Sequence, residues 1–142
     1  MIEWHIPPKP FRVRVVRLIK AGETQEALDL LSDHFKVPEV HLIPPRGALS
    51  RKVESGLVST EVGRWILDFG KASGKLLGGY LPRSTFWRLP MIIVLPGYEN
   101  DPRVILHEFY HHVAMYTKAG HRVEEGILEA ITGRFLEGLE VT

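Results

Sequence analysis

Residues 101–129, which read DPRVILHEFYHHVAMYTKAGHRVEEGILE, carry the clearest structural signals in the chain. Asp101 is a favourable N-cap residue and Pro102 suits the first turn of a helix, so a helix is expected to begin here. Apolar residues continue at helical spacing to about Lys118, and Gly120 falls where a helix would end. This segment therefore predicts a helix from Pro102 to about Lys118.

A second helix is expected from about Arg122 to Leu139. Its apolar stripe comprises Ile127, Leu128, Ile131 and Phe135. Because the connection between the two helices is short, they should pack against each other as a C-terminal hairpin.

The first of these helices contains His107-Glu108-Phe109-Tyr110-His111, an H-E-x-x-H motif. Side chains four residues apart leave one face of a helix with Cβ atoms about 5–6 Å apart, so His107 and His111 can both bind one Zn²⁺ ion. Glu108 would point beside the ion, where it can accept a proton from metal-activated water and later pass it to a leaving amine. The motif predicts a catalytic zinc site with Glu108 as general base.

A catalytic zinc ion usually has three protein ligands and one open position. The second predicted helix offers four acidic candidates for the third ligand, which are Glu124, Glu125, Glu129 and Glu137. After a turn near Gly120, either Glu125 or Glu129 can lie opposite His111, since these two glutamates share a helix face. The sequence spacing alone therefore allows either Glu125 or Glu129 as the third ligand.

The length and composition of the chain exclude several classes of protein. A chain of 142 residues fits one domain, 1–142, and the absence of cysteine excludes disulfide scaffolds, thiol nucleophiles and Cys-ligated metals. A balance of 18 Lys+Arg against 17 Asp+Glu gives no sign of a nucleic-acid partner. The longest apolar run, Met91 to Leu95, is too short to span a membrane, and the N-terminus has no secretory signal, so a cytoplasmic location is expected.

The remaining elements indicate an α+β fold with a small mixed sheet packed against helices. Expected helices are Phe11 to Lys20, preferred over a strand, then Gln25 to Phe35 with Thr24 as cap, and a third from Ser59 or Thr60 to Gly74. Expected strands are 39–43, 76–81 and 91–95.

Two other groups of residues have simpler explanations than binding or catalysis. His112 lies about 100° around the helix from His111, so it is expected to be partly buried or hydrogen-bonded. Arg14, Arg17 and Lys20 share a helix face without interleaved aromatic residues, and are expected to form a solvated surface.

The residues from Gly78 to Glu129 resemble the core of a zincin metallopeptidase of the gluzincin branch, and the small size of the chain resembles the minimal gluzincins. In that branch the third ligand is a glutamate on the helix after the motif helix, often before glycine and followed four residues later by an acidic residue. The run Glu124-Glu125-Gly126-Ile127-Leu128-Glu129 is similar to this pattern. The resemblance implies Glu125 as ligand and Glu129 as a carboxylate that orients a ligand histidine. Only residues 112–124 separate His111 from Glu125, so Glu129 becomes the better ligand if the hairpin does not turn tightly.

Gly79-Tyr80 and Met91 to Leu95 also resemble regulatory metallopeptidases that act on transcriptional repressors. In zincins the strand before the motif helix is usually a sheet edge that pairs with extended substrate. The resemblance therefore implies that Met91 to Leu95 is the peptide-binding strand. The third histidine and the glycine that metzincins place after the motif are absent, which argues against that branch.

The function expected from the sequence is a zinc-dependent peptidase of zincin-like α+β fold that acts on a peptide or protein substrate. Zn²⁺ is held by His107, His111 and Glu125, with Glu108 as the catalytic base. The alternative is a non-catalytic or regulatory zincin-fold binding module that keeps the metal without hydrolysis. A nucleic-acid binder that uses Arg14, Arg17 and Lys20 is the least favoured hypothesis.

Overall fold

The computed structural model describes residues 6–43, 78–81, 90–94, 98–117 and 120–139. Within these ranges the α-helices are α1 (Lys9–Lys20), α2 (Thr24–Phe35), α5 (Pro102–Ala114) and α6 (Glu125–Leu136), with a short 3₁₀ turn, η1 (Gly120–Arg122), before α6. Its strands are β1 (His41–Ile43), β2 (Gly78–Leu81) and β3 (Met91–Val94). The helix expected from Ser59 or Thr60 to Gly74 lies outside the described residues.

The three strands form one mixed sheet with the order β1-β3-β2. β1 runs parallel to β3 with His41 opposite Met91, and β2 runs antiparallel to β3 with Tyr80 opposite Ile92. The expectation that Met91 to Leu95 forms a sheet edge is therefore wrong, because β3 is paired on both sides. All four side chains of β3 are buried, as is typical of a central strand with a continuous apolar sequence.

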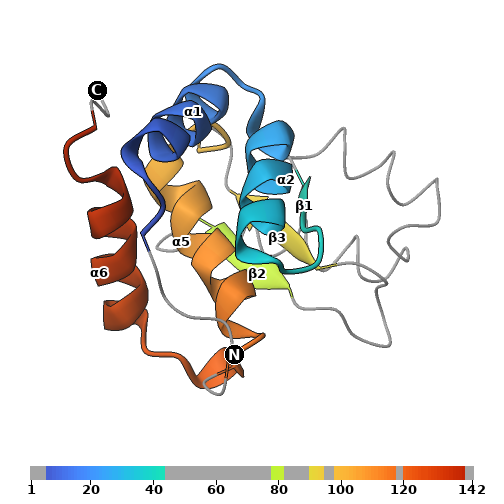
Figure 1. Ribbon diagram of the computed structural model, residues 1–142. Coiled ribbons are helices and arrows are strands. Elements are labelled where there is room, and N and C mark those ends of the chain that lie inside the picture. Colours follow the sequence, from blue (N-terminus) through green and yellow to red (C-terminus); the bar gives the residue numbers. More distant parts are fainter. Residues whose placement is uncertain (1–5, 44–77, 82–89, 95–97, 118–119, 140–142) are drawn as a thin grey trace, which may run out of the picture.

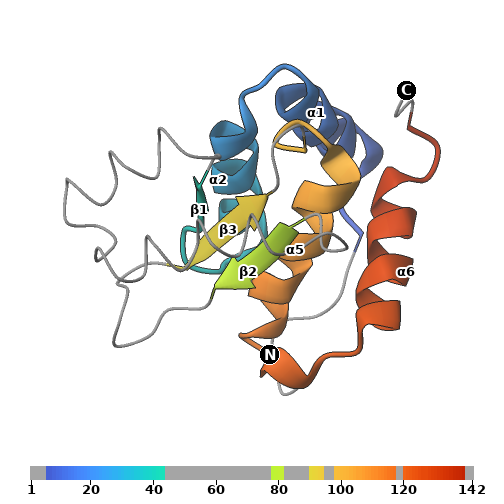
Figure 2. The ribbon, with the colours of Figure 1, turned by 180° about the vertical axis from the view of Figure 1, so that it is seen from behind.

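The motif helix α5 lies in the middle of the molecule. Figures 1 and 2 show α2 and α5 against the same face of the sheet, with α6 beside α5 on the side away from β2. α1 packs on α2 and also reaches α5. The expected α+β class with a small mixed sheet and a C-terminal helical hairpin is confirmed in this general form.

The hydrophobic core joins the four described α-helices to the central strand β3. Its fully buried apolar side chains include Val15, Ile19, Leu28, Leu31, Ile92, Ile105, Leu106, Phe109, Tyr110, Val113, Leu128 and Phe135. The ring of Phe35 on α2 packs 5.7 Å, centroid to centroid, from both Phe109 and Tyr110 on α5. Because residues within the H-E-x-x-H motif are core residues, the rotation of α5 about its own axis is fixed by packing.

α5 ends four residues earlier than expected, at Ala114 instead of Lys118. Tyr116 N donates to Val113 O at 3.0 Å and Thr117 N donates to Ala114 O at 2.9 Å, so the last turn tightens to i→i+3 hydrogen bonds. The hydroxyl of Thr117 also donates to the carbonyl of Ala114 at 2.7 Å. This side-chain bond competes with continuation of the helix.

The second helix of the hairpin is also shorter than expected, since η1 occupies residues 120–122 and α6 begins only at Glu125. Gly120 opens η1 with a φ of +55°. Within α6, Leu128 and Phe135 are buried as expected, but Ile127 is 45% exposed, so its place in the apolar stripe was wrongly predicted.

Two contacts between distant segments fix the helices that flank α5. Thr24 does not cap α2 as expected, and its hydroxyl instead donates to the carbonyl of Glu99 at 2.9 Å. Arg12 donates through Nε to Pro7 O at 2.9 Å and through Nη1 to Phe135 O at 2.9 Å and Glu137 O at 3.0 Å. A guanidinium group at the last carbonyls of α6 satisfies acceptors that the helix itself leaves open.

None of the helices in the described ranges has the length and apolar character needed to cross a bilayer.

Candidate metal centre

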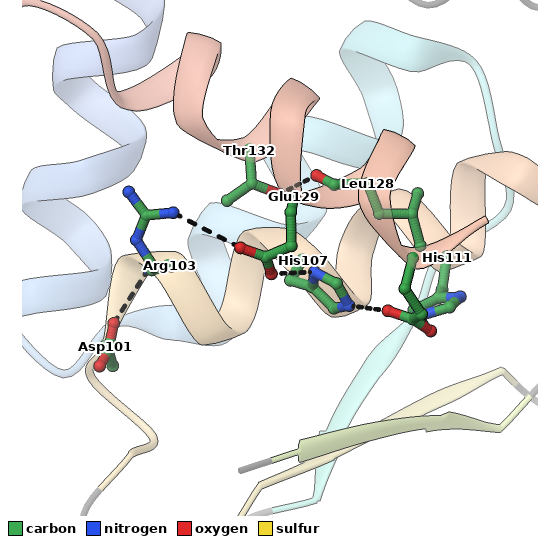
Figure 3. Close-up of polar contacts among 8 residues, drawn as sticks. Asp101, Arg103, His107, His111, Leu128, Glu129 and Thr132 are labelled. Carbon is green, nitrogen blue, oxygen red and sulfur yellow. Dashed lines mark hydrogen bonds and ion pairs between the residues drawn. The ribbon is translucent and has the colours of Figure 1, made fainter. Parts of the chain in front are cut away.

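Helix α5 presents the two histidines of the motif on one face. The side chain of Asp101 accepts a hydrogen bond from Arg103 N at 3.0 Å and so caps the helix, as the sequence predicts. From this start His107 and His111 fall one turn apart, and their rings lie 5.2 Å from centroid to centroid (Figure 3). Both are partly buried, so each imidazole is held by the protein yet open to solvent.

Glu125, the first residue of α6, bridges the two histidines. Its Oε2 lies 2.6 Å from Nε2 of His107, and its Oε1 lies 2.9 Å from Nε2 of His111. One ligand atom from each of the three residues falls within 4.8 Å of the other two. These side chains, separated by as many as 18 positions in the chain, therefore form a group that could hold a metal ion.

Glu129, the other candidate for third ligand, lies on the far side of His107. Its Oε1 is 2.7 Å from Nδ1 of His107, while its Oε2 is 3.7 Å from Nη1 of Arg103 (Figure 3). The Nδ1 contact is short but poorly aligned as a hydrogen bond. Sequence spacing did not decide which of the two glutamates is the third ligand. In the structure Glu125 lies beside Nε2 of both histidines, whereas Glu129 lies beside Nδ1 of His107.

The chemistry of this donor set fits a divalent cation. Two imidazole nitrogens and one carboxylate are a common ligand set for zinc at sites that keep an open position. A histidine must offer a lone pair to bind a metal, and burial lowers the pKa of His111, although the charge of Glu125 opposes this shift. Nε2 of His107 lies within 2.6 Å of Oε2 of Glu125, so a cation bound between them would replace a proton as the group shared by the two side chains.

Glu108 lies outside this ligand group and is buried, with 7% of its surface exposed. Burial, helped by the negative charge of Glu125, raises the pKa of its carboxyl group from 4.5 to about 8. Glu108 shares a helix face with His112, and His112 contacts β2, so this face of α5 is turned toward the sheet. The acid of the motif is thus a buried group on the face of α5 that is turned toward the sheet.

His112 is fully buried and hydrogen-bonded through both ring nitrogens, as the sequence analysis expects. Nε2 lies 2.6 Å from the carbonyl oxygen of Pro38, and Nδ1 lies 2.6 Å from the hydroxyl of Tyr80. Because a carbonyl can only accept, Nε2 carries the proton and Nδ1 accepts from Tyr80. Burial lowers the pKa of His112, which favours this neutral form. His112 therefore joins α5 to β2 and to the segment after α2.

Arg103 was not identified from the sequence as a residue of this site. One signal was present, because Arg103 is four residues before His107 and therefore continues the stripe formed by His107 and His111. The partner on α6, Glu129, could not be assigned to it without knowing how the two helices pack.

Comparisons with protein-family models, with curated proteins and with solved structures find no match to this chain.

Proposed function

We propose that the protein is a zinc-dependent peptidase in which His107, His111 and Glu125 hold the metal and Glu108 is the general base. The observation that carries the proposal is the convergence of two Nε2 atoms, one helical turn apart, on the carboxylate of Glu125 from the following helix. Random placement of surface acids rarely puts one carboxylate on both histidines of an H-E-x-x-H motif.

The residues around the ligand group suit hydrolysis of an amide. A zinc ion held by these residues would supply Lewis acidity, which would lower the pKa of water at the site toward about 7, polarise a substrate carbonyl and favour ionised Glu108. Glu108 takes the proton from the attacking water as the new C–O bond forms. It then delivers that proton to the amide nitrogen as the C–N bond breaks. Its burial excludes bulk water from competing for the proton.

We assign the substrate-binding strand to β2 instead of β3. Among the described strands β1 and β2 lie at the two ends of the sheet, and β2 is the one that packs closely against α5. Tyr80 of β2 is tied to α5 through His112, which holds this strand at a fixed distance from the motif helix. An extended peptide that pairs with the side of β2 on which no described strand lies would run beside the face of α5 that carries Glu108.

The test uses the full chain loaded with one equivalent of zinc and an unfolded protein, such as reduced casein, as substrate. We expect cleavage by the wild type and, in Glu108→Gln, unchanged zinc content with hydrolysis lowered by about 10²-fold or more. Glu26→Gln is the matched control, because Glu26 is exposed on α2 and its loss should leave cleavage unchanged. Equal cleavage by Glu108→Gln contradicts the assigned base. Tight zinc binding by a wild type that cleaves nothing favours the non-catalytic binding module instead.

A further inference from the structure

Arg103 occupies a position that helix stability does not explain. It is the second residue of α5, directly after Pro102, and its side chain is half exposed. The N-terminus of a helix carries partial positive charge, so a cation in the first turn is unfavourable for the helix itself. The first turn of α5 holds no acidic residue that would offset it, apart from the capping Asp101. A residue that conflicts with its local environment calls for a partner elsewhere in the fold.

That partner is Glu129 on the second turn of α6. The guanidinium Nη1 of Arg103 lies 3.7 Å from Oε2 of Glu129, and the other oxygen of the same carboxylate lies 2.7 Å from Nδ1 of His107. Arg103 and His107 project from one face of α5, so Glu129 spans two neighbouring side chains of that stripe (Figure 3). One carboxylate thus connects a cation to a proposed metal ligand.

Glu129 needs such an anchor if it is to hold His107 in place. Its side chain is 54% exposed and has three rotatable bonds, so it would lose its orientation readily without a second contact. The contact with Nδ1 is short but poorly aligned, and small rotations of the carboxylate would therefore change it. With Oε2 paired to Arg103, Oε1 stays beside Nδ1 and favours the tautomer of His107 that carries its proton on Nδ1, which leaves the lone pair of Nε2 for the cation.

We propose that Arg103 is a positioning residue for the metal centre, which acts through Glu129 to fix the orientation and tautomer of His107. This inference rests on the proposed metal site but not on hydrolysis. It predicts a change in zinc affinity that is opposite in sign to the change expected from charge alone. Removal of a cation near a bound divalent metal should strengthen metal binding by Coulomb's law, whereas loss of a positioning contact should weaken it.

The experiment measures the zinc affinity of the metal-free full chain by competition with a chromogenic chelator. Arg103→Gln should weaken zinc binding roughly 3- to 10-fold, less than the about 10- to 100-fold typical for loss of a direct partner of a ligand, which is expected for Glu129→Ala. Arg103→Lys should restore part of the affinity, since it keeps the charge without the planar donor geometry. Arg17→Gln, on the exposed face of α1, removes the same charge from an element without site residues and should have no effect.

A double mutant separates action through Glu129 from a general effect on the fold. In the Glu129→Ala background, Arg103→Gln should cause no further loss of affinity, and the visible spectrum of bound Co²⁺ should be the same with and without Arg103. Zinc binding by Arg103→Gln that equals or exceeds that of the wild type overturns the inference and leaves the metal site standing. An equal loss in both backgrounds also overturns it. A wild type that binds no zinc overturns the metal site itself, so the two failures are distinguishable.

Discussion

Replacement of Glu108 by Gln in the metal-free protein should remove a specific dependence of stability on pH. Burial and the charge of Glu125 raise the pKa of Glu108 in the folded protein to about 8, from 4.5 in an unfolded chain. Between these two values the folded protein keeps a proton on Glu108 that the unfolded chain has released. The free energy of unfolding therefore falls as pH rises from about 4.5 to about 8, and it is constant with respect to this group above pH 8.

The size of this effect follows from the shift. A difference of one pKa unit corresponds to about 1.36 kcal/mol, so the shift of Glu108 predicts a loss of roughly 5 kcal/mol across the whole range. Glutamine has the shape of the protonated acid and cannot ionise, so Glu108→Gln should lack this loss. Burial lowers the pKa values of His111 and His112, so their contribution to the free energy of unfolding rises with pH. Both histidines are present in the wild type and in Glu108→Gln, so this contribution largely cancels when the two proteins are compared.

The assay is urea unfolding of both proteins at pH 5, 6, 7 and 8 with a chelator present. The two free energies should be similar near pH 5, and by pH 8 the wild type should be the less stable protein by a few kcal/mol. Parallel pH profiles would contradict this prediction, because they would show that Glu108 releases its proton at the same pH in the folded and unfolded chains.

Three further predictions follow from other contacts. Tyr80→Phe leaves Nδ1 of buried His112 without a donor and should lower the free energy of unfolding by about 1–3 kcal/mol, measured by urea titration; an unchanged value would contradict the assigned tautomer. Arg12→Ala removes three donated hydrogen bonds and should cost about 1–3 kcal/mol, with little recovery in Arg12→Lys because a single ammonium does not replace the planar fork. A fixed zinc concentration should raise the melting temperature of the wild type by more than that of Glu125→Ala, and equal rises in a thermal scan would exclude Glu125 as ligand.

Local signals in the sequence were sufficient to predict the motif helix. Asp101, Pro102 and the apolar spacing located the start of α5 and the face that carries His107 and His111, because capping and helical period act within a few residues. The predicted end of the helix was wrong, because the helix ends where the hydroxyl of Thr117 donates a hydrogen bond to the carbonyl of Ala114. Such a bond competes with the helix only once the chain has begun to turn.

Non-local features could not be predicted in the same way. The continuous apolar sequence of β3 indicated a buried strand, yet its central position depends on pairing with β1 and β2, which are distant in sequence. Likewise Glu125 and Glu129 share one helix face, and the rotation that brings Glu125 to both Nε2 atoms is set by where η1 ends and α6 begins. Helix packing decides between the two glutamates, and spacing alone does not.

The most direct test of the metal centre is anomalous diffraction at the zinc edge from crystals of the wild-type protein grown with one equivalent of zinc. We predict a single strong peak within bonding distance, about 2.0–2.2 Å, of Nε2 of His107, Nε2 of His111 and a carboxylate oxygen of Glu125. A map with no peak there, or with its peak on other side chains, contradicts the assignment of these three residues as a metal site.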